Sequence, residues 1–243
     1  AQDEAQRGER AMSHAVEIPA HVIERIMTKR GRLNVFDRFE PRKTALVVID
    51  MQNFFVADVD SARSICPNIN RLAAVVRARG GTVAWVQMEL AEAAGAPSQW
   101  PLYHEYFFST AKKEAHKLGC TRGSEGVKIY KDLEVRDGDI VTHKTRFSAF
   151  IQGASDLHDR LRARGIENLL IAGTVTNFCC ETSARDAMML DYRVAMVSDA
   201  CAARYDEDHI VGLTSVWQSF GDVRTAEDCI THLLRPTDAK AAE

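Results

Sequence analysis

The sequence lacks the features by which several large classes of protein are recognised. No apolar run approaches the roughly 18 residues that a membrane-spanning helix needs. Residues 1–12 are polar and charged, without the apolar stretch of a secretory signal. Basic charge is not in excess, since 31 Lys and Arg residues face 34 Asp and Glu residues for a formal net charge of −3. We therefore expect neither a membrane protein nor a nucleic-acid-binding protein.

Cysteine is scarce and forms no recognisable pattern. The six cysteines follow none of the paired spacings of zinc sites, and six in 243 residues make no disulfide framework. We expect a cytoplasmic protein, because a reducing compartment is the default for such a sequence. A cysteine is then either inert filling of the core or a nucleophile.

The composition suits one folded domain with a terminal extension, because 46% of the residues are hydrophobic and 27% are charged. We expect an N-terminal arm over residues 1–40, with a short helix at 21–28, and a single domain over 41–243. An apolar stripe at helical spacing runs along the arm and predicts packing across a subunit boundary. The stripe consists of Ile18, Val22, Ile23 and Ile26. The alternative is that the arm packs along the edge of its own sheet.

Beyond residue 41, short apolar runs alternate with segments of helical periodicity. The runs predict strands at 45–49, 82–88, 139–142, 168–172 and 193–197. The periodic segments predict helices at 65–76, 157–161, 180–190 and 209–220. Residues 95–126 show neither pattern and predict an irregular excursion that covers the substrate. The alternation indicates an α/β fold with three α/β/α layers around a doubly wound, mainly parallel sheet.

Three ionisable residues fall at or just after the ends of predicted strands, namely Asp50, Lys144 and Cys179. Ligands of open parallel sheets bind beyond the carboxyl ends of the strands, so these side chains belong to the expected site. A buried amine can hold the acid ionised, the acid can take the proton of the thiol, and the ammonium favours the thiolate.

Each of the three residues also has a structural interpretation. Asp50 suits the cap of a following helix, Lys144 a solvated loop, and Cys179 an inert buried thiol. Residues 173–179 favour the functional interpretation, because they predict a strand end, a tight turn and a helix start. The positive field of a helix start stabilises a thiolate, and its free N–H groups can bind an oxyanion.

Three separated segments resemble the isochorismatase-like cysteine hydrolases. Residues 45–55, ALVVIDMQNFF, resemble the family's strand that ends in Asp and continues as M-Q-[ND]-x-F. Residues 144–150, KTRFSAF, resemble K-x-x-[YF]-S-[GA]-F, and residues 173–187, GTVTNFCCETSARDA, resemble G-x-x-T-[ND]-x-C-V-x-x-T-x-R-D-A. The order and separation of the three segments make the resemblance specific, and it covers about residues 44–233.

The resemblance implies a catalytic triad in which Cys179 is the nucleophile, Asp50 the general base and Lys144 the third member. It also implies a cis peptide bond before Val175, which aims the Val175 N–H at the substrate. That N–H and the N–H of Cys179 would form the oxyanion hole. Cys180 stands where the family usually has Val, and we interpret it as core filling.

The resemblance further implies a reaction without metal or cofactor. Nicotinamidases of the family hold a metal through a D-x-H motif, and no such motif occurs between Asp50 and Lys144. His104 and His116 lie in that interval but lack the companion spacing.

Retention of Cys179 favours hydrolysis of a C–N bond over the ether cleavage of the isochorismatases proper. Residues 144–148 and 85–87 resemble the K-x-R-[YF]-S and W-x-Q segments of ureidoacrylate amidohydrolases, a type related to N-carbamoylsarcosine amidases and biuret hydrolases. The implied reaction cleaves a small amide or ureido substrate that bears a carboxylate, through a thioester-type acyl-enzyme with release of ammonia. The implied assembly is a homodimer or homotetramer.

Candidate substrate contacts follow from residue chemistry, and each has a structural alternative. Arg146 suits the carboxylate as a two-pronged donor. The other candidates are Gln52, Asn53 and Gln87 for a ureido group, Phe55, Phe147, Phe178 and Trp217 as pocket walls, and Trp100, Tyr103 and Tyr106 as a lid. Two other functions remain open, an amidase of a neutral or aromatic amide (nicotinamidase-like or maleamate-like) and a non-enzymatic binding member of the fold.

Overall fold

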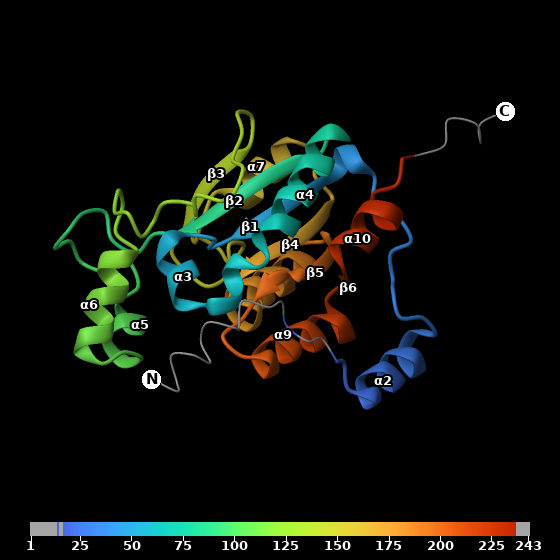
Figure 1. Ribbon diagram of the computed structural model, residues 1–243, viewed down its shortest axis with the longest axis horizontal. Helices are drawn as coiled ribbons and strands as arrows, with labels where there is room; N and C mark the ends of the chain where they lie inside the picture. The colour runs from blue at the N-terminus through green and yellow to red at the C-terminus, as the bar shows by residue number, and fades with distance from the viewer. Residues whose placement is uncertain (1–13, 15–16, 237–243) are drawn as a thin grey trace.

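The computed structural model describes residue 14 and residues 17–236. Its centre is a six-stranded, all-parallel sheet in the order β3-β2-β1-β4-β5-β6 (Figure 1). The strands are β1 (Thr44–Ile49), β2 (Thr82–Met88), β3 (Ile140–Lys144), β4 (Asn168–Thr174), β5 (Arg193–Ala202) and β6 (Asp222–Arg224). The strand order reverses between β1 and β4, which confirms the predicted doubly wound α/β fold.

Helices cover both faces of this sheet, which explains the continuous apolar runs of its central strands. In β1, Leu46 and Val48 point into one hydrophobic core, whereas Ala45, Val47 and Ile49 point into the other. The first core is closed by α4 (Cys66–Ala78) and α10 (Ala226–Asp228), and the second by α7 (Leu157–Ala163), α8 (Glu181–Met189) and α9 (Asp206–Ser219).

The shorter elements lie mostly outside these layers. They are the helices α3 (Asn53–Asp58), α5 (Pro101–Tyr106) and α6 (Thr110–Gly119), the 3-10 turns Pro41–Lys43 and Asp60–Arg63, and the π-type turns η3 (Thr176–Cys180) and η4 (Cys229–Leu233). Helices α5 and α6 stand together beside α3, off the end of the sheet (Figure 1). The expectation of an irregular excursion over 95–126 was therefore wrong in part, because two helices form there. No helix in the described part of the chain has the length and apolarity needed to cross a membrane.

The described part of the N-terminal arm packs on its own chain. Its helix, α2 (Ala20–Arg30), lies against α9, with Val22 and Ile26 buried. The ammonium of Lys29 donates to the backbone oxygen of Gln218 and to the hydroxyl of Ser219. The prediction that this stripe crosses a subunit boundary was wrong for Val22 and Ile26, because α9 of the same chain covers them.

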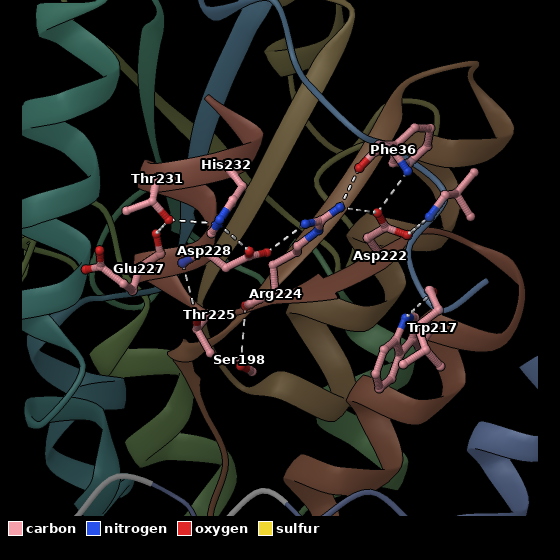
Figure 2. A network of polar contacts seen from close by, with 12 residues as sticks. Phe36, Ser198, Trp217, Asp222, Arg224, Thr225, Glu227, Asp228, Thr231 and His232 are labelled. Carbon is pink, nitrogen blue, oxygen red and sulfur yellow. Dashed lines mark hydrogen bonds and ion pairs between the residues drawn. The ribbon is translucent and has the colours of Figure 1, made fainter. Parts of the chain in front are cut away.

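A polar network fixes residues 35–36 of the arm to the edge strand β6 (Figure 2). The backbone N–H groups of Val35 and Phe36 donate to the buried Asp222 carboxylate at 2.7 and 3.0 Å. Arg224 pairs with the same carboxylate at 3.3 Å and donates to the Phe36 carbonyl. Phe39 is fully buried in the same core as α4. The arm therefore covers the sheet edge, as in the alternative prediction.

Candidate active site

Asp50, Lys144 and Cys179 lie together at the carboxyl edge of the sheet. Asp50 follows β1, Lys144 is the last residue of β3, and Cys179 lies in the η3 turn after β4. The Lys144 ammonium is 2.8 Å from a carboxylate oxygen of Asp50 and 3.6 Å from the sulfur of Cys179. The Asp50 and Lys144 side chains are 1% and 0% exposed. The sheet thus joins an acid, an amine and a thiol whose positions span 130 residues of sequence.

Local backbone geometry fixes these side chains. Asp50 has a positive φ of 52°, and its N–H donates to the carbonyl of Val86 at 2.8 Å. Gly173 faces the end of β1 with a φ of 118°, and a Cβ there would clash with the backbone of Ile49. Only glycine permits this approach, which brings the turn that carries the thiol beside Asp50. Lys144 also donates to the Arg146 carbonyl at 2.9 Å.

Burial and mutual charge set the proton affinities of the three groups. Burial raises the pKa of Asp50 and outweighs the opposing attraction of Lys144. Burial alone would lower the pKa of Lys144, but the charges of Asp50 and Cys179 reverse this and raise it. Burial, reinforced by the Asp50 charge, raises the pKa of the Cys179 thiol to about 12. The expectation of a stabilised thiolate conflicts with this raised pKa, because desolvation of the thiol outweighs the attraction of the ammonium.

The turn before the thiol has the shape of an oxyanion site. The Thr174–Val175 peptide bond is cis. The N–H groups of Phe178 and Cys180 both donate to the Val175 carbonyl at 3.2 Å. The Val175 N–H makes no hydrogen bond with any residue that the structure describes. It is therefore available as a donor to a ligand beside Cys179.

A cavity of about 450 Å³ opens over Cys179. Three of the expected wall residues line it, Phe55, Phe147 and Phe178. The α5–α6 segment closes another side. Of the three expected lid residues, Tyr103 lines the cavity, whereas Trp100 and Tyr106 do not. That segment contributes Tyr103, Phe108, Lys112, Ala115 and His116, and the remaining lining residues are Phe54, Ala57, Asp58, Met88, Val175 and Arg204. The walls are thus mainly aromatic, with a few charged groups among them.

Comparison with known proteins adds independent information on this site. The isochorismatase domain matches residues 44–228. The chain belongs to the isochorismatase family. The match includes all three members of the buried triad and leaves most of the N-terminal arm outside.

Curated relatives in the isochorismatase family are similar to most of this chain. Ureidoacrylate amidohydrolase RutB of Pseudomonas savastanoi pv. phaseolicola is 31% identical over 210 residues, which cover 80% of this chain and 85% of the relative. The protein of the same name from Caulobacter vibrioides is 32% identical over 206 residues, which cover 78% and 90%.

Solved structures of the family share the fold. A cysteine hydrolase from Pseudomonas syringae pv. phaseolicola superposes with a TM-score of 0.69 at 27% identity, over 82% of this chain and 97% of the other. An N-carbamoylsarcosine amidase from Thermoplasma acidophilum superposes with a TM-score of 0.61 over 76% and 97%. At 24% identity, the latter likeness concerns the fold alone.

Three polar candidates of this isochorismatase-family site form hydrogen bonds to backbone groups. The side-chain amide of Gln52 exchanges two hydrogen bonds with the Met88 backbone, at 3.0 and 2.7 Å. Gln87 donates to the Val127 carbonyl at 2.6 Å, and Asn53 donates to Glu125 at 2.9 Å. None of the three lines the cavity. Their side chains bind backbone groups of neighbouring segments, which agrees with the structural alternative rather than with substrate binding.

Two further candidates lie outside the cavity. Arg146 donates to the carbonyls of Gln99 and Thr145 and packs over the Trp100 ring at 5.1 Å. Trp217 donates its indole N–H to the Leu33 carbonyl and so holds the arm. The expected roles of Arg146 as carboxylate ligand and Trp217 as pocket wall therefore conflict with their placement.

Sequence reasoning missed Arg204. This residue lines the cavity together with Asp58, and the two side chains form an ion pair. The signal was its position just after a strand, but β5 runs to Ala202 rather than to the predicted residue 197. Lys112 from α6 is a second cation in the lining. The positive charge that suits a carboxylate is therefore supplied by other residues than predicted.

The second cysteine of the motif is separate from the cavity. Cys180 is fully buried, and burial followed by its contact with Cys201 raises its pKa well above the ordinary value. It does not line the cavity, whereas Cys179 does. This placement agrees with core filling as its role.

The rings of His104 and His116 are hydrogen-bonded to each other. Nε2 of His104 lies 2.9 Å from Nδ1 of His116, and Nδ1 of His104 lies 2.7 Å from the hydroxyl of Ser98. Burial, followed by the charge of His104, lowers the pKa of His116 to about 4. Within the described ranges, no three His, Cys, Asp or Glu side chains are grouped as metal ligands. Metal independence stays a prediction.

Proposed function

We propose that this protein is a cysteine amidohydrolase that cleaves a small ureido or amide substrate bearing a carboxylate. The observation that carries this proposal is the contact of Lys144 with both Asp50 and Cys179 at the floor of the aromatic cavity. As a member of a family whose curated relatives are amidohydrolases, the chain is a hydrolase of carbon–nitrogen bonds other than peptide bonds.

In the first half-reaction, Asp50 takes the proton of the Cys179 thiol as the sulfur attacks the substrate carbonyl carbon. The raised pKa of Asp50 suits a base that receives this proton, and the raised pKa of Lys144 keeps its ammonium charged. The N–H groups of Val175 and Cys179 hold the oxyanion. Collapse of the intermediate breaks the C–N bond, and the proton held on Asp50 leaves with the nitrogen as ammonia.

In the second half-reaction, water replaces the amine on the thioester-type acyl-enzyme. Asp50, again ionised, takes a proton from water while the hydroxyl oxygen bonds to the acyl carbon. The C–S bond then breaks, and Cys179 recovers its proton from Asp50. The sum is one amide plus one water giving one acid plus one ammonia, with no metal or cofactor.

The charged residues of the cavity lining support an anionic substrate. Arg204 and Lys112 offer two cations above the thiol, and Asp58 holds the Arg204 guanidinium in the lining. A guanidinium binds a carboxylate with two parallel hydrogen bonds. We assign the carboxylate subsite to Arg204 in place of Arg146.

The aromatic lining favours one competing substrate class. Phe147 stacks on Phe178 at 5.5 Å, and the Tyr103 ring lies 5.1 Å from that of Phe147. Such walls also suit a neutral aromatic amide. A non-enzymatic binding protein would not need the buried ion pair beside a cavity thiol, since that pair is costly to maintain.

Exposed apolar side chains in and near the cavity support assembly into a homodimer or homotetramer. Phe178 lines the cavity and is 45% exposed, and Ile151 and Met189, which line a second hollow that shares Phe147 with the cavity, are 50% and 63% exposed. Apolar patches of this kind are typical of subunit contacts. Light scattering of the full chain checks the subunit number.

An ammonia-release assay over four substrate classes tests the proposed function. The substrates are ureido acids, biuret, nicotinamide and maleamate, each assayed with and without a chelator. We expect the highest kcat/KM for a ureido acid, unchanged by chelation. A preference for nicotinamide would favour the neutral amide alternative. No ammonia from any substrate, with Cys179 no more reactive to a thiol alkylator than Cys180, would overturn the enzyme assignment.

A further inference from the structure

His14 lies outside the segment that matches the isochorismatase domain, yet its side chain is only 5% exposed. Its Nδ1 atom is 2.6 Å from a carboxylate oxygen of Asp206, and its Nε2 atom accepts a hydrogen bond from the Ala203 N–H at 2.9 Å. These partners lie about 190 positions further along the chain. The ring is therefore bound into the loop that joins β5 to α9.

The contacts define the protonation of the ring. Nε2 accepts from a backbone N–H and so carries no proton, which places the proton on Nδ1, where it is donated to Asp206. Ser61 lies 3.1 Å from Nε2 and donates its hydroxyl to the Ala203 carbonyl at 2.8 Å. The backbone of Ala203 is thus held at its N–H by His14 and at its C=O by Ser61.

The two residues that contact Nε2 of His14, Ala203 and Ser61, flank the charged part of the cavity. Ala203 immediately precedes Arg204, and Ser61 is three positions after Asp58. Arg204 and Asp58 form the ion pair of the cavity lining. His14 therefore connects the two walls that carry the proposed carboxylate subsite.

A second contact leads toward the nucleophile. The His14 ring stacks on His209 at 4.3 Å, and Nδ1 of the fully buried His209 lies 2.8 Å from the Thr176 hydroxyl. Thr176 begins the η3 turn that carries Cys179. Burial lowers the pKa of His209 to about 3, so its ring is neutral at ordinary pH.

We propose that His14 is a positioning residue, which holds the Ala203 backbone between the two cavity walls and so fixes Arg204 for an anionic substrate. The inference rests on the proposed carboxylate subsite. It gives His14 a role in substrate preference, because loss of this side chain frees the Ala203–Arg204 backbone on one side.

Alkylation of Cys179 by two reagents of similar shape tests this role without a known substrate. Iodoacetate carries the carboxylate that Arg204 should attract, and iodoacetamide is neutral. The measured quantity is the rate constant for iodoacetate divided by that for iodoacetamide at Cys179. Both rates are followed by mass spectrometry of the peptide that contains Cys179. A purely structural loosening raises both rates together and leaves the ratio unchanged.

The variants are His14→Ala, His14→Gln and Arg204→Ala, with His158→Ala as a matched histidine control that loses only a contact to Tyr192. We expect His14→Ala and Arg204→Ala each to lower the ratio by about fivefold, the equivalent of one partly exposed ion pair. The Gln variant keeps an acceptor for the Ala203 N–H and should retain more of the ratio. If His14→Ala fails to fold, the Gln variant carries the test with about a twofold decrease.

Two results would contradict the inference in distinguishable ways. A ratio that falls in Arg204→Ala but not in the His14 variants would overturn the role of His14 and leave the carboxylate subsite standing. A ratio unchanged in all variants would overturn both the subsite and the positioning role.

Discussion

The ammonium of Lys144 lies 2.8 Å from a carboxylate oxygen of Asp50, and almost no surface of either side chain is exposed. A buried ion pair gains little net stability, because desolvation of both charges offsets their attraction. Its value here is chemical. The pair keeps a base with a raised pKa beside the Cys179 thiol, away from bulk water.

We expect Asp50→Asn to reduce kcat about 10²-fold or more, since it removes the proton acceptor and keeps the shape of the side chain. Lys144→Ala should reduce it similarly and also lower the free energy of unfolding by about 3–5 kcal/mol, because Asp50 is left buried and unpaired. Turnover and urea denaturation of both variants check this. Near-normal turnover in either variant would remove that residue from the mechanism.

The pH dependence of alkylation tests the protonation of the thiol. Since the pKa of Cys179 is raised to about 12, the thiolate fraction should increase with each pH unit. The rate of reaction with iodoacetamide should therefore rise from pH 7 to 10 without a plateau. In Asp50→Asn the rise should shift to lower pH, because the Asp50 charge is one cause of the raised pKa. A plateau below pH 8 in the unmodified protein would indicate a preformed thiolate.

The central strands and the meeting of Asp50, Lys144 and Cys179 at one edge were predictable because their signals are local. The run at 82–88 coincides with β2, and the apolar run ending at Ile49 locates Asp50. Parallel strands bring their carboxyl ends to one edge, so three distant positions could be assigned to one site.

Prediction failed where tertiary contacts decide the structure. In β5, the polar pair Ser198 and Asp199 interrupts the apolar run, so the predicted strand ended early and Arg204 was missed. The α5–α6 segment lacks a clear period because Tyr103 and Phe108 face the cavity and each other, whereas Tyr106 and Phe107 are exposed. Trp217 lies on α9 where the arm covers it, and no local pattern in the sequence predicts that contact.

The two arginines near the site give a matched test of the carboxylate subsite. Arg204→Ala should raise KM for a ureido acid about tenfold or more, because a charge-assisted pair with the substrate is lost. Arg146→Ala should change KM less than about twofold, since that side chain binds backbone carbonyls outside the cavity. Steady-state kinetics on one substrate decide between them. The opposite pattern would return the subsite to Arg146.

The attachment of the arm predicts a large effect at the sheet edge. Asp222→Ala should lower the free energy of unfolding by about 3–5 kcal/mol, because it leaves Arg224 and two backbone N–H groups without their buried acceptor. Asp228→Ala, which removes a partly exposed partner of Arg224, should cost about 1 kcal/mol. Urea denaturation midpoints at constant m-value measure both. Equal, small losses in the two variants would show that the arm does not stabilise the edge.

The most direct test of the account compares ammonia release from a ureido acid by two adjacent cysteine variants. Cys179→Ala should abolish turnover while the melting temperature stays near that of the unmodified protein, because the cavity thiol is the nucleophile. Cys180→Val should keep turnover within about twofold, since that thiol only fills the core. Turnover that survives Cys179→Ala, or disappears only in Cys180→Val, would contradict the account.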